Sequence, residues 1–155
     1  MSQTIEKRMA ELGLELPEAA KSVANYLPIV ASGNLILTSG QLPLSNGKLI
    51  ATGLVGRELD VTAAALAARQ CALNILAQAQ AHLGSLDRIA RIIKITVFVA
   101  SAEDFTEQHL VANGASDVLL AVCGDKGKHA RSAVGVAALP MNAPVEIEAM
   151  LEIDQ

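Results

Sequence analysis

The stretch DVTAAALAARQCALNILAQAQAHLGSLDRIARIIKITVFVA, residues 60–100, decides the fold class because it joins a helix pattern to a strand pattern. Apolar side chains recur there at steps of three and four residues. This spacing predicts a helix that begins at the candidate N-cap Asp60 and stops at Gly84. The apolar stripe is rich in alanine and suits close packing on a sheet. It contains Val61, Ala64, Ala65, Ala68, Ala72, Ile75, Leu76, Ala79 and Leu83.

Residues 88–100 of the same stretch predict a β-strand. Strict alternation places two sets of side chains on opposite faces of it. One set is Arg91, Ile93, Ile95, Val97 and Val99, and the other is Ile92, Lys94, Thr96 and Phe98. Because both sets contain apolar residues, we expect both faces of this strand to be at least partly covered.

The N-terminal part of the chain favours a short helix over residues 4–12, which ends at Gly13 and Pro17. We interpret residues 1–24 as a helical extension and residues 25–155 as the main domain. The remaining elements follow in chain order. They are a hairpin within 25–43 around the turn signal Ser32-Gly33-Asn34, a turn and short strand at 46–53, a helix at 102–122 that Asn113-Gly114 weakens, and strands near 131–138 and 145–153.

This order of elements predicts a single α+β domain with a mixed sheet of five to six strands and two main helices on one face. A helix is about 10 Å across and strands lie about 4.8 Å apart, so two helices cover roughly four strands of one face. No further helix remains for the other face, which also carries apolar residues. An exposed patch of that kind is rare in monomers, so we expect the protein to form a symmetric oligomer through the sheet.

Composition narrows the function classes. The chain has 155 residues, a net charge of −4 and 2% aromatic residues, which argues against a nucleic-acid-binding protein. No stretch approaches the roughly 18–20 apolar residues of a membrane span, and MSQTIEKRMAELG lacks the apolar core of a signal peptide, so we expect a cytoplasmic protein. The cysteines and histidines are scattered without metal-ligand spacing, so we expect no metal.

Arg131 is the first candidate for a binding residue. Alternation places it on one strand face with Ala133, Gly135 and Ala137, whose small side chains leave room for a ligand. A guanidinium is permanently charged, and its planar fork fits a carboxylate. The acid or base for a reaction could come from Glu146 or Glu148 on the neighbouring strand. Tyr26 and Asn113 are further candidate polar contacts.

A purely structural interpretation of each candidate remains open at this point. Arg131 could pair with an acid of the next strand, a link worth about 0–1 kcal/mol if it is exposed. The acids Glu146, Glu148 and Glu152 could form only the solvated face of an edge strand. Asn113 could be a surface residue that weakens its helix, and Tyr26 could cover a hydrophobic interface.

Three segments together resemble the reactive intermediate deaminase family, the YjgF type that is also labelled endoribonuclease L-PSP. They are GNLILTSGQLP (33–43), AARQCALNILAQAQAHLGSLDRIARIIKITVFVA (67–100) and HARSAVGVAALPMNAPVEIEAM (129–150). The motifs that carry the resemblance are Ser39-Gly40-Gln41, Arg69-Gln70, Ala130-Arg131-Ser132 and Val145-Glu146-Ile147-Glu148. The resemblance implies a chorismate-mutase-like α+β fold and a homotrimer with ligand clefts between subunits. It also implies cofactor-free hydrolysis of enamines and imines such as 2-aminoacrylate to a 2-keto acid and ammonia.

The resemblance also implies roles for individual residues. Arg131 matches the arginine that holds the substrate carboxylate, and Glu146 matches the acid that positions the attacking water. Tyr26 matches an aromatic residue that lines the cleft, and Gly40 matches a backbone position at the cleft wall. Asn113 falls near a family asparagine in the helix, with a shift of one residue.

The sequence also departs from the family pattern. Ala133 stands where many members have a cysteine, which excludes thiol chemistry there, and NYLP replaces the usual Gly-Pro-Tyr context of Tyr26. The N-terminal helix and the approach CGDKGKHA to Arg131 are additional. Two other functions therefore remain alternatives: a trimeric module that binds small carboxylates without catalysis, and a ribonuclease or translation inhibitor.

Overall fold

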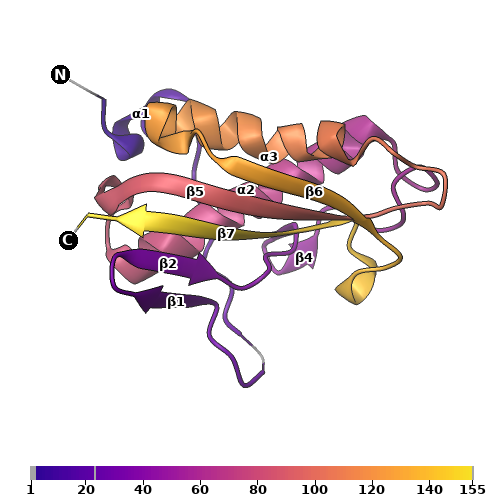
Figure 1. Ribbon diagram of the computed structural model, residues 1–155, viewed down its shortest axis with the longest axis horizontal. Coiled ribbons are helices and arrows are strands. Elements are labelled where there is room, and N and C mark those ends of the chain that lie inside the picture. The colour runs from indigo at the N-terminus through magenta and orange to yellow at the C-terminus, as the bar shows by residue number, and fades with distance from the viewer. Residues whose placement is uncertain (1–2, 23, 155) are drawn as a thin grey trace.

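The computed structural model describes residues 3–22 and 24–154 (Figure 1); residues 1, 2, 23 and 155 of the expected extension and main domain lie outside this description. The fold is α+β, as predicted, with a five-stranded mixed sheet in the order β1-β2-β7-β5-β6. Its strands are β1 (Ile29–Ser32), β2 (Leu35–Thr38), β5 (Ile89–Ala100), β6 (Ala130–Val136) and β7 (Val145–Ile153). The other elements are α1 (Ile5–Glu11), α2 (Val61–Leu83), α3 (Gln108–Cys123), the small hairpin β3 (Leu44–Ser45) and β4 (Lys48–Leu49), and the 3-10 turns η1 (Leu86–Arg88), η2 (Gly124–Gly127) and η3 (Pro140–Asn142).

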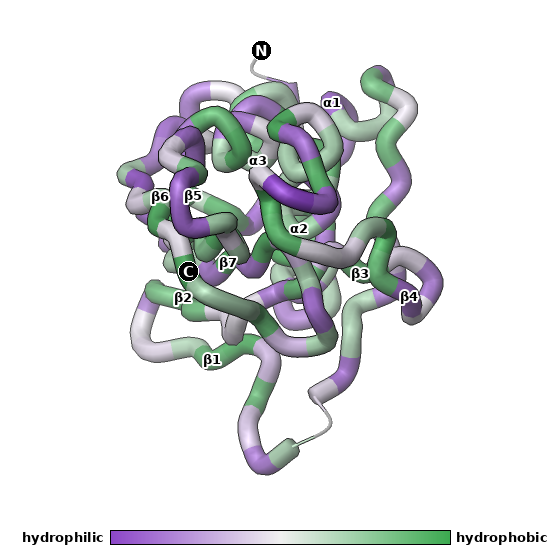
Figure 2. Tube along the Cα trace, turned by 90° about the vertical axis from the view of Figure 1, so that its right-hand side faces the viewer, coloured by the Kyte–Doolittle hydropathy of each residue, from purple (hydrophilic) through white to green (hydrophobic). Residues whose placement is uncertain are grey.

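Helix α2 has the ends that its sequence predicts. Asp60 accepts a hydrogen bond from the backbone N–H of Ala63 at 2.8 Å, and Gly84 ends the helix in the left-handed conformation with φ of 84°. The helix runs between the main sheet and the β3–β4 hairpin (Figure 2), and its residues 71–79 are buried on all sides. Its alanines therefore pack against neighbours in several directions rather than along one stripe.

Strand β5 departs from the strict alternation that we expected. Register shifts interrupt its pairing with β7 between Ile89 and Arg91 and again between Ile92 and Lys94. As a result Ile92, which is 1% exposed, lies on the helix-covered face together with Ile95. The expected placement of Ile92 with Lys94 on the opposite face was wrong, because β-bulges insert residues that a simple period of two cannot anticipate.

Helix α3 begins six residues later than expected, at Gln108 rather than near residue 102. The preceding segment forms a turn in which the backbone N–H of Phe105 donates to the carbonyl of Ala102, and Gln108 Nε2 donates to the carbonyl of Phe105 at 2.9 Å. Gly114 does not simply weaken this helix. A Cβ atom at Gly114 would overlap the carbonyl oxygen of Ala65, so glycine allows α2 and α3 to approach closely.

Helices α2 and α3 cover only one face of the sheet, which we call the helix-covered face. The other face, which we call the open face, carries no helix in the part of the chain that the structure describes. Register pairing places Phe98 of β5, Glu146 of β7 and Val134 of β6 side by side on this open face. Val134 is 42% exposed there. The expected exposed apolar surface is therefore present in the single chain.

Candidate functional site

Arg131 lies on β6, the edge strand of the sheet. It pairs with Ile95, which is fully buried beneath the helices, so the Arg131 side chain starts on the helix-covered face. Its guanidinium reaches α3. Nη1 donates to Asn113 Oδ1 at 2.9 Å and to Ser116 Oγ at 3.1 Å, and Nη2 donates to the carbonyl of His109 at 3.3 Å. Helix α3 thus holds one side of the guanidinium.

The remaining donors of Arg131 decide what this residue can bind. A guanidinium has five N–H donors, and α3 takes both of those on Nη1 and one of those on Nη2. The Nε donor and the second Nη2 donor remain, in the described part of the chain, for an added ligand. Two donors on neighbouring nitrogens match the two oxygens of a carboxylate.

The small residues that follow Arg131 differ in their surroundings. Ala133 packs against the core, and a Cβ atom at Gly135 would lie 2.8 Å from Gln108 Nε2 and 3.2 Å from Ser101 Oγ. Side chains of the protein itself therefore lie beside Ala133 and on one side of Gly135, while Ala137 is exposed. The guanidinium of Arg131 lies at the edge of the sheet, where a ligand can reach it.

Glu146 lies on the opposite side of the sheet. It pairs with Phe98, and its neighbours Val145 and Ile147 are fully buried toward the helices, so the carboxyl group is on the open face. Gly40 lies directly beside it, because a Cβ atom at Gly40 would overlap Glu146 Oε1. Burial, and secondarily the negative charge of Glu148, raise the pKa of the Glu146 carboxyl above its ordinary value.

Tyr26 belongs to the loop before β1 and is 56% exposed. Two hydrogen bonds tie this loop to the end of β2: Ser39 Oγ donates to the carbonyl of Leu27 at 2.7 Å, and the Ser39 backbone N–H donates to the carbonyl of Pro28 at 2.9 Å. The Tyr26 loop is therefore held next to the residue that precedes Gly40.

The predicted site residues therefore fall into two groups. The arginine cluster consists of Arg131 with Asn113, Ser116 and His129 at the edge of the helix-covered face. The glutamate cluster consists of Glu146 and Gly40 on the open face, beside the Tyr26 loop. In a single chain the two clusters therefore start from opposite faces of one sheet.

Sequence reasoning missed Ser116 and His129. His129 contacts Ser116 through Nε2 at 2.9 Å and the carbonyl of Gly127 through Nδ1 at 2.6 Å. The signal was present, because His129 and Arg131 are two apart at the start of a strand, and Asn113 and Ser116 are three apart on a helix. It pointed to shared faces, but only the packing of α3 against β6 joins the two pairs.

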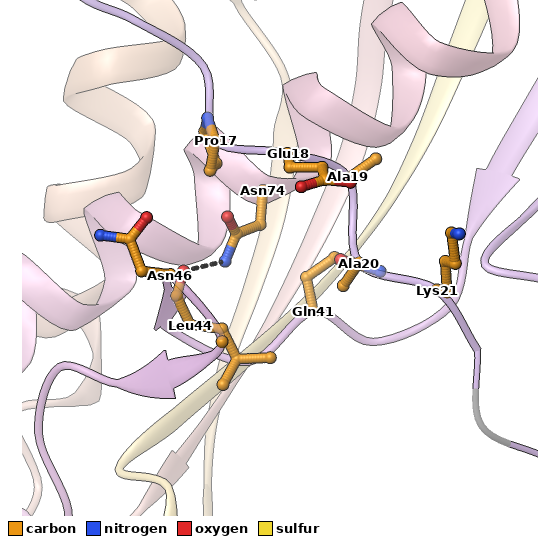
Figure 3. Close-up of a pocket in the computed structure, with 10 residues that line it drawn as sticks. Pro17, Glu18, Ala19, Ala20, Lys21, Gln41, Leu44, Asn46 and Asn74 are labelled. Atoms are coloured by element: carbon orange, nitrogen blue, oxygen red, sulfur yellow. Dashed lines mark hydrogen bonds between the residues drawn. The ribbon is translucent and has the colours of Figure 1, made fainter.

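A separate cavity of about 440 Å³ lies between the N-terminal segment 17–21 and the β3–β4 hairpin (Figure 3). Amide side chains of α2 form part of its wall. Asn74 Nδ2 donates to the carbonyls of Leu42 and Leu44, and Gln78 Nε2 donates to the carbonyl of Ala20 at 2.7 Å. These amides hold extended backbone segments onto α2. The polar side chains in the cavity wall are therefore explained by their role in the fold.

Neither a metal centre nor a membrane span emerges from the structure. Among residues 3–22 and 24–154, no three His, Cys, Asp or Glu side chains are grouped so that they could hold a metal ion. The helices of the same residues are each too short or too polar to cross a bilayer. The cysteines Cys71 and Cys123 are buried free thiols, and burial raises the pKa of Cys123 to about 12, so neither resembles a reactive thiolate.

Comparison with known proteins identifies the class. The model of the family described as "YjgF/chorismate_mutase-like, putative endoribonuclease" matches residues 6–152. The chain belongs to this family.

Individual relatives agree with the family assignment. The chain is 47% identical over 154 residues to Protein TCP17 of Trypanosoma cruzi, covering 99% of this chain and 96% of that protein. It is 36% identical over 133 residues to a RutC family protein of Pasteurella multocida, covering 85% and 90% of the two chains. Its fold matches the crystal structure of Atu1372 from Agrobacterium tumefaciens, a protein of unknown function, with a TM-score of 0.91, 56% identity and coverage of 97% and 92%.

Proposed function

We propose that this protein hydrolyses reactive enamines and imines of the 2-aminoacrylate type to 2-keto acids and ammonia. The observation that carries the proposal is the state of Arg131. Helix α3 fixes one side of its guanidinium and leaves Nε and one Nη2 donor to receive a carboxylate. Such a clamp selects small 2-imino and 2-keto acids, which carry a carboxylate next to the reacting carbon.

Glu146 suits the second half of the reaction. The enamine first takes a proton on carbon and becomes an imine. Water then adds to the imine carbon, the C–N bond of the resulting carbinolamine breaks, and ammonia leaves as the carbonyl forms. A carboxyl group with a raised pKa can accept the proton of the attacking water and return it to the departing nitrogen. The reaction needs no metal or organic cofactor.

The site is proposed to form between subunits. Arg131 and Glu146 start from opposite faces of the sheet in one chain, so a site that uses both must take them from two copies. The exposed apolar residues of the open face supply a surface for that contact. The family resemblance sets the proposed number of subunits at three. Light scattering at micromolar concentration should give the mass of a trimer, and the mass of a monomer would contradict the intersubunit site.

Activity is best tested by coupling the protein to a lyase that releases 2-aminoacrylate. The rate of keto-acid formation should rise above the spontaneous rate when the protein is added. Arg131→Ala should lose this acceleration, whereas Arg57→Ala, which removes an exposed arginine from a loop, should keep it. An unchanged rate with the wild-type protein would overturn the proposal.

Two further measurements, made alongside the turnover assay, separate the two alternatives. Calorimetric binding of pyruvate without any turnover would favour a carboxylate-binding module. A ribonuclease is supported by the family description, while the net charge of −4 and the scarcity of aromatic residues oppose it. The ribonuclease alternative would require RNA cleavage by metal-free, repurified protein that a site variant abolishes.

We place the activity in the cytoplasm, although two yeast relatives are named as mitochondrial proteins, so fractionation of cells is the test.

A further inference from the structure

We propose that His129 and Ser116 form a hydrogen-bond relay that fixes the orientation of the Arg131 guanidinium. The proposal rests on the function above only for its consequence, which is the strength of carboxylate binding. His129 and Ser116 are positioning residues in this scheme. They do not touch the substrate, and they act through Arg131.

The direction of the relay follows from the partners of His129. Nδ1 lies 2.6 Å from the carbonyl oxygen of Gly127, and a carbonyl can only accept, so the proton of the ring is on Nδ1. In the neutral ring Nε2 is then an acceptor. The hydroxyl of Ser116, 2.9 Å away, must donate to it.

Ser116 transmits this orientation to Arg131. With its proton directed at His129, the Ser116 oxygen presents its lone pairs elsewhere, and it accepts from Arg131 Nη1 at 3.1 Å. Every bond from Arg131 through Ser116 and His129 to the Gly127 carbonyl therefore has a defined donor and acceptor. Such chains hold side chains more tightly than isolated surface bonds because each bond polarises the next.

The end of the relay is rigid. Gly127 is buried in the short turn η2 after α3, and a Cβ atom there would come 2.5 Å from the carbonyl oxygen of Leu119. The turn is thus packed directly against α3. Both Ser116 and the Gly127 anchor belong to the α3–η2 unit, so the relay ties the edge strand β6 to that unit at the point where Arg131 emerges.

The relay is expected to strengthen carboxylate binding because it orients the Arg131 guanidinium in advance. A free arginine side chain loses considerable conformational entropy when it forms a two-point bond. The relay, together with Asn113 and the His109 carbonyl, restricts Nη1 and Nη2 before a ligand arrives. Loss of the relay should leave the charge of Arg131 in place. Its affinity for a carboxylate should fall by about threefold to tenfold, the effect expected for one lost hydrogen bond.

Two pairs of variants test the relay. Ser116→Ala removes the hydroxyl, whereas Ser116→Thr keeps it. His129→Asn keeps a donor near the position of Nδ1 but removes the acceptor at Nε2, whereas His129→Gln places an amide group near the position of Nε2. We expect the first member of each pair to be impaired and the second to be closer to wild type.

The first readout is independent of any enzymatic activity. Proton–nitrogen NMR of the arginine side chains, with Arg131→Lys used for assignment, should show separate Nη signals for Arg131, because its bonds to α3 slow rotation of the guanidinium. In Ser116→Ala and His129→Asn these signals should merge or broaden. Unchanged Arg131 signals in His129→Asn would overturn the relay, whatever the protein catalyses, because His129 reaches Arg131 only through Ser116.

The second readout is calorimetric affinity for pyruvate and, where turnover is present, the separate values of kcat and KM. Affinity should fall about threefold to tenfold in Ser116→Ala and His129→Asn, with KM raised and kcat less affected. Ser116→Thr should restore affinity, which a merely structural loss would not predict. Full affinity in both impaired variants would contradict the relay. If wild-type protein binds no pyruvate while its Arg131 signals still depend on His129, the proposed function fails and the relay stands.

Discussion

Contacts within the chain bury the helix-covered face of the sheet, whereas side chains on the open face remain accessible to a ligand or to another molecule. On the first face Ile95 is fully buried, and Gly114 allows α2 and α3 to approach closely. On the second, Val134 is 42% exposed, and burial raises the pKa of the Glu146 carboxyl. The two faces therefore differ in how far the chain itself covers their side chains, and Arg131 lies at the edge strand β6 on the helix-covered face.

Arg131→Lys gives the largest expected effect and tests this edge. Lysine keeps the positive charge but loses the planar fork, so kcat/KM should fall about 10- to 150-fold, which corresponds to about 1.5–3 kcal/mol. Tm should change little, because the side chain lies at the surface edge of the fold. Kinetics and thermal unfolding of one purified variant check both parts.

Arg57→Lys is the matched control for that change, since Arg57 is an exposed arginine on a loop. Its kcat/KM and Tm should stay close to wild type. A fully active Arg131→Lys protein would show that Arg131 only links β6 to α3, and the carboxylate clamp would have to be abandoned.

Gly114→Ala tests the closed face. Its Cβ atom would overlap the carbonyl oxygen of Ala65, which is backbone and cannot rotate away. We expect a loss of about 1–3 kcal/mol in the free energy of unfolding, even though alanine is the better helix former. Chemical denaturation measures it. Leu120→Ala, which shortens an exposed side chain on the same helix, should cost less, and equal losses in the two variants would argue against a close helix contact at Gly114.

The elements that the sequence predicted well are those with local signals. Asp60 and Gly84 bound α2 because capping and the left-handed C-terminus depend on neighbouring residues alone. The bulges of β5 and the late start of α3 depend on distant partners. Register with β7 moves Ile92 to the helix side, and the turn before Gln108 is held by contacts that no periodicity records.

The candidate site shows the same limit. Alternation correctly separated Glu146 from Ile147, and resemblance to a family pointed to Arg131. Sequence reasoning could not place Arg131 and Glu146 on opposite faces, because that depends on β6 pairing in parallel with β5 while β7 pairs antiparallel. Nor could it assign Ser116 as a partner of Arg131, since the two are 15 residues apart on different elements.

Gly40→Ala tests the open face without removing any functional group. The added methyl would overlap Glu146 Oε1, the end of a flexible side chain that can swing aside. Stability should therefore change little, while displacement of the carboxyl should lower kcat about tenfold. Steady-state kinetics and Tm distinguish this from the behaviour of Gly114→Ala.

Gly33→Ala supplies the opposite pattern for comparison. Gly33 has φ of 60° in the β1–β2 turn, with nothing near its Cβ position. Alanine there should cost about 1 kcal/mol of stability through backbone strain and leave kcat unchanged. If Gly40→Ala keeps full activity, the carboxyl of Glu146 does not need its observed position.

Glu146→Gln is expected to have the smallest effect on stability, and the effect should depend on pH. Burial, then the charge of Glu148, raise the pKa of this carboxyl in the folded protein above its ordinary value of 4.5. Below that ordinary value both folded and unfolded states are protonated, and the wild type and the variant should be equally stable. As pH rises from the ordinary pKa through the raised one, the unfolded state releases its proton first, so the wild type loses stability relative to the variant. At neutral pH the Gln variant should therefore be more stable, by less than about 1 kcal/mol because the side chain is partly solvated.

Urea unfolding of Glu146→Gln and wild type between pH 4 and pH 7.5 measures the difference, with the exposed Glu103→Gln as a control that should follow the wild type. If the Gln variant were less stable than wild type at neutral pH, the Glu146 charge would have to be stabilised by other groups in the folded protein. The open face would then be as well satisfied by contacts within the chain as the helix-covered face.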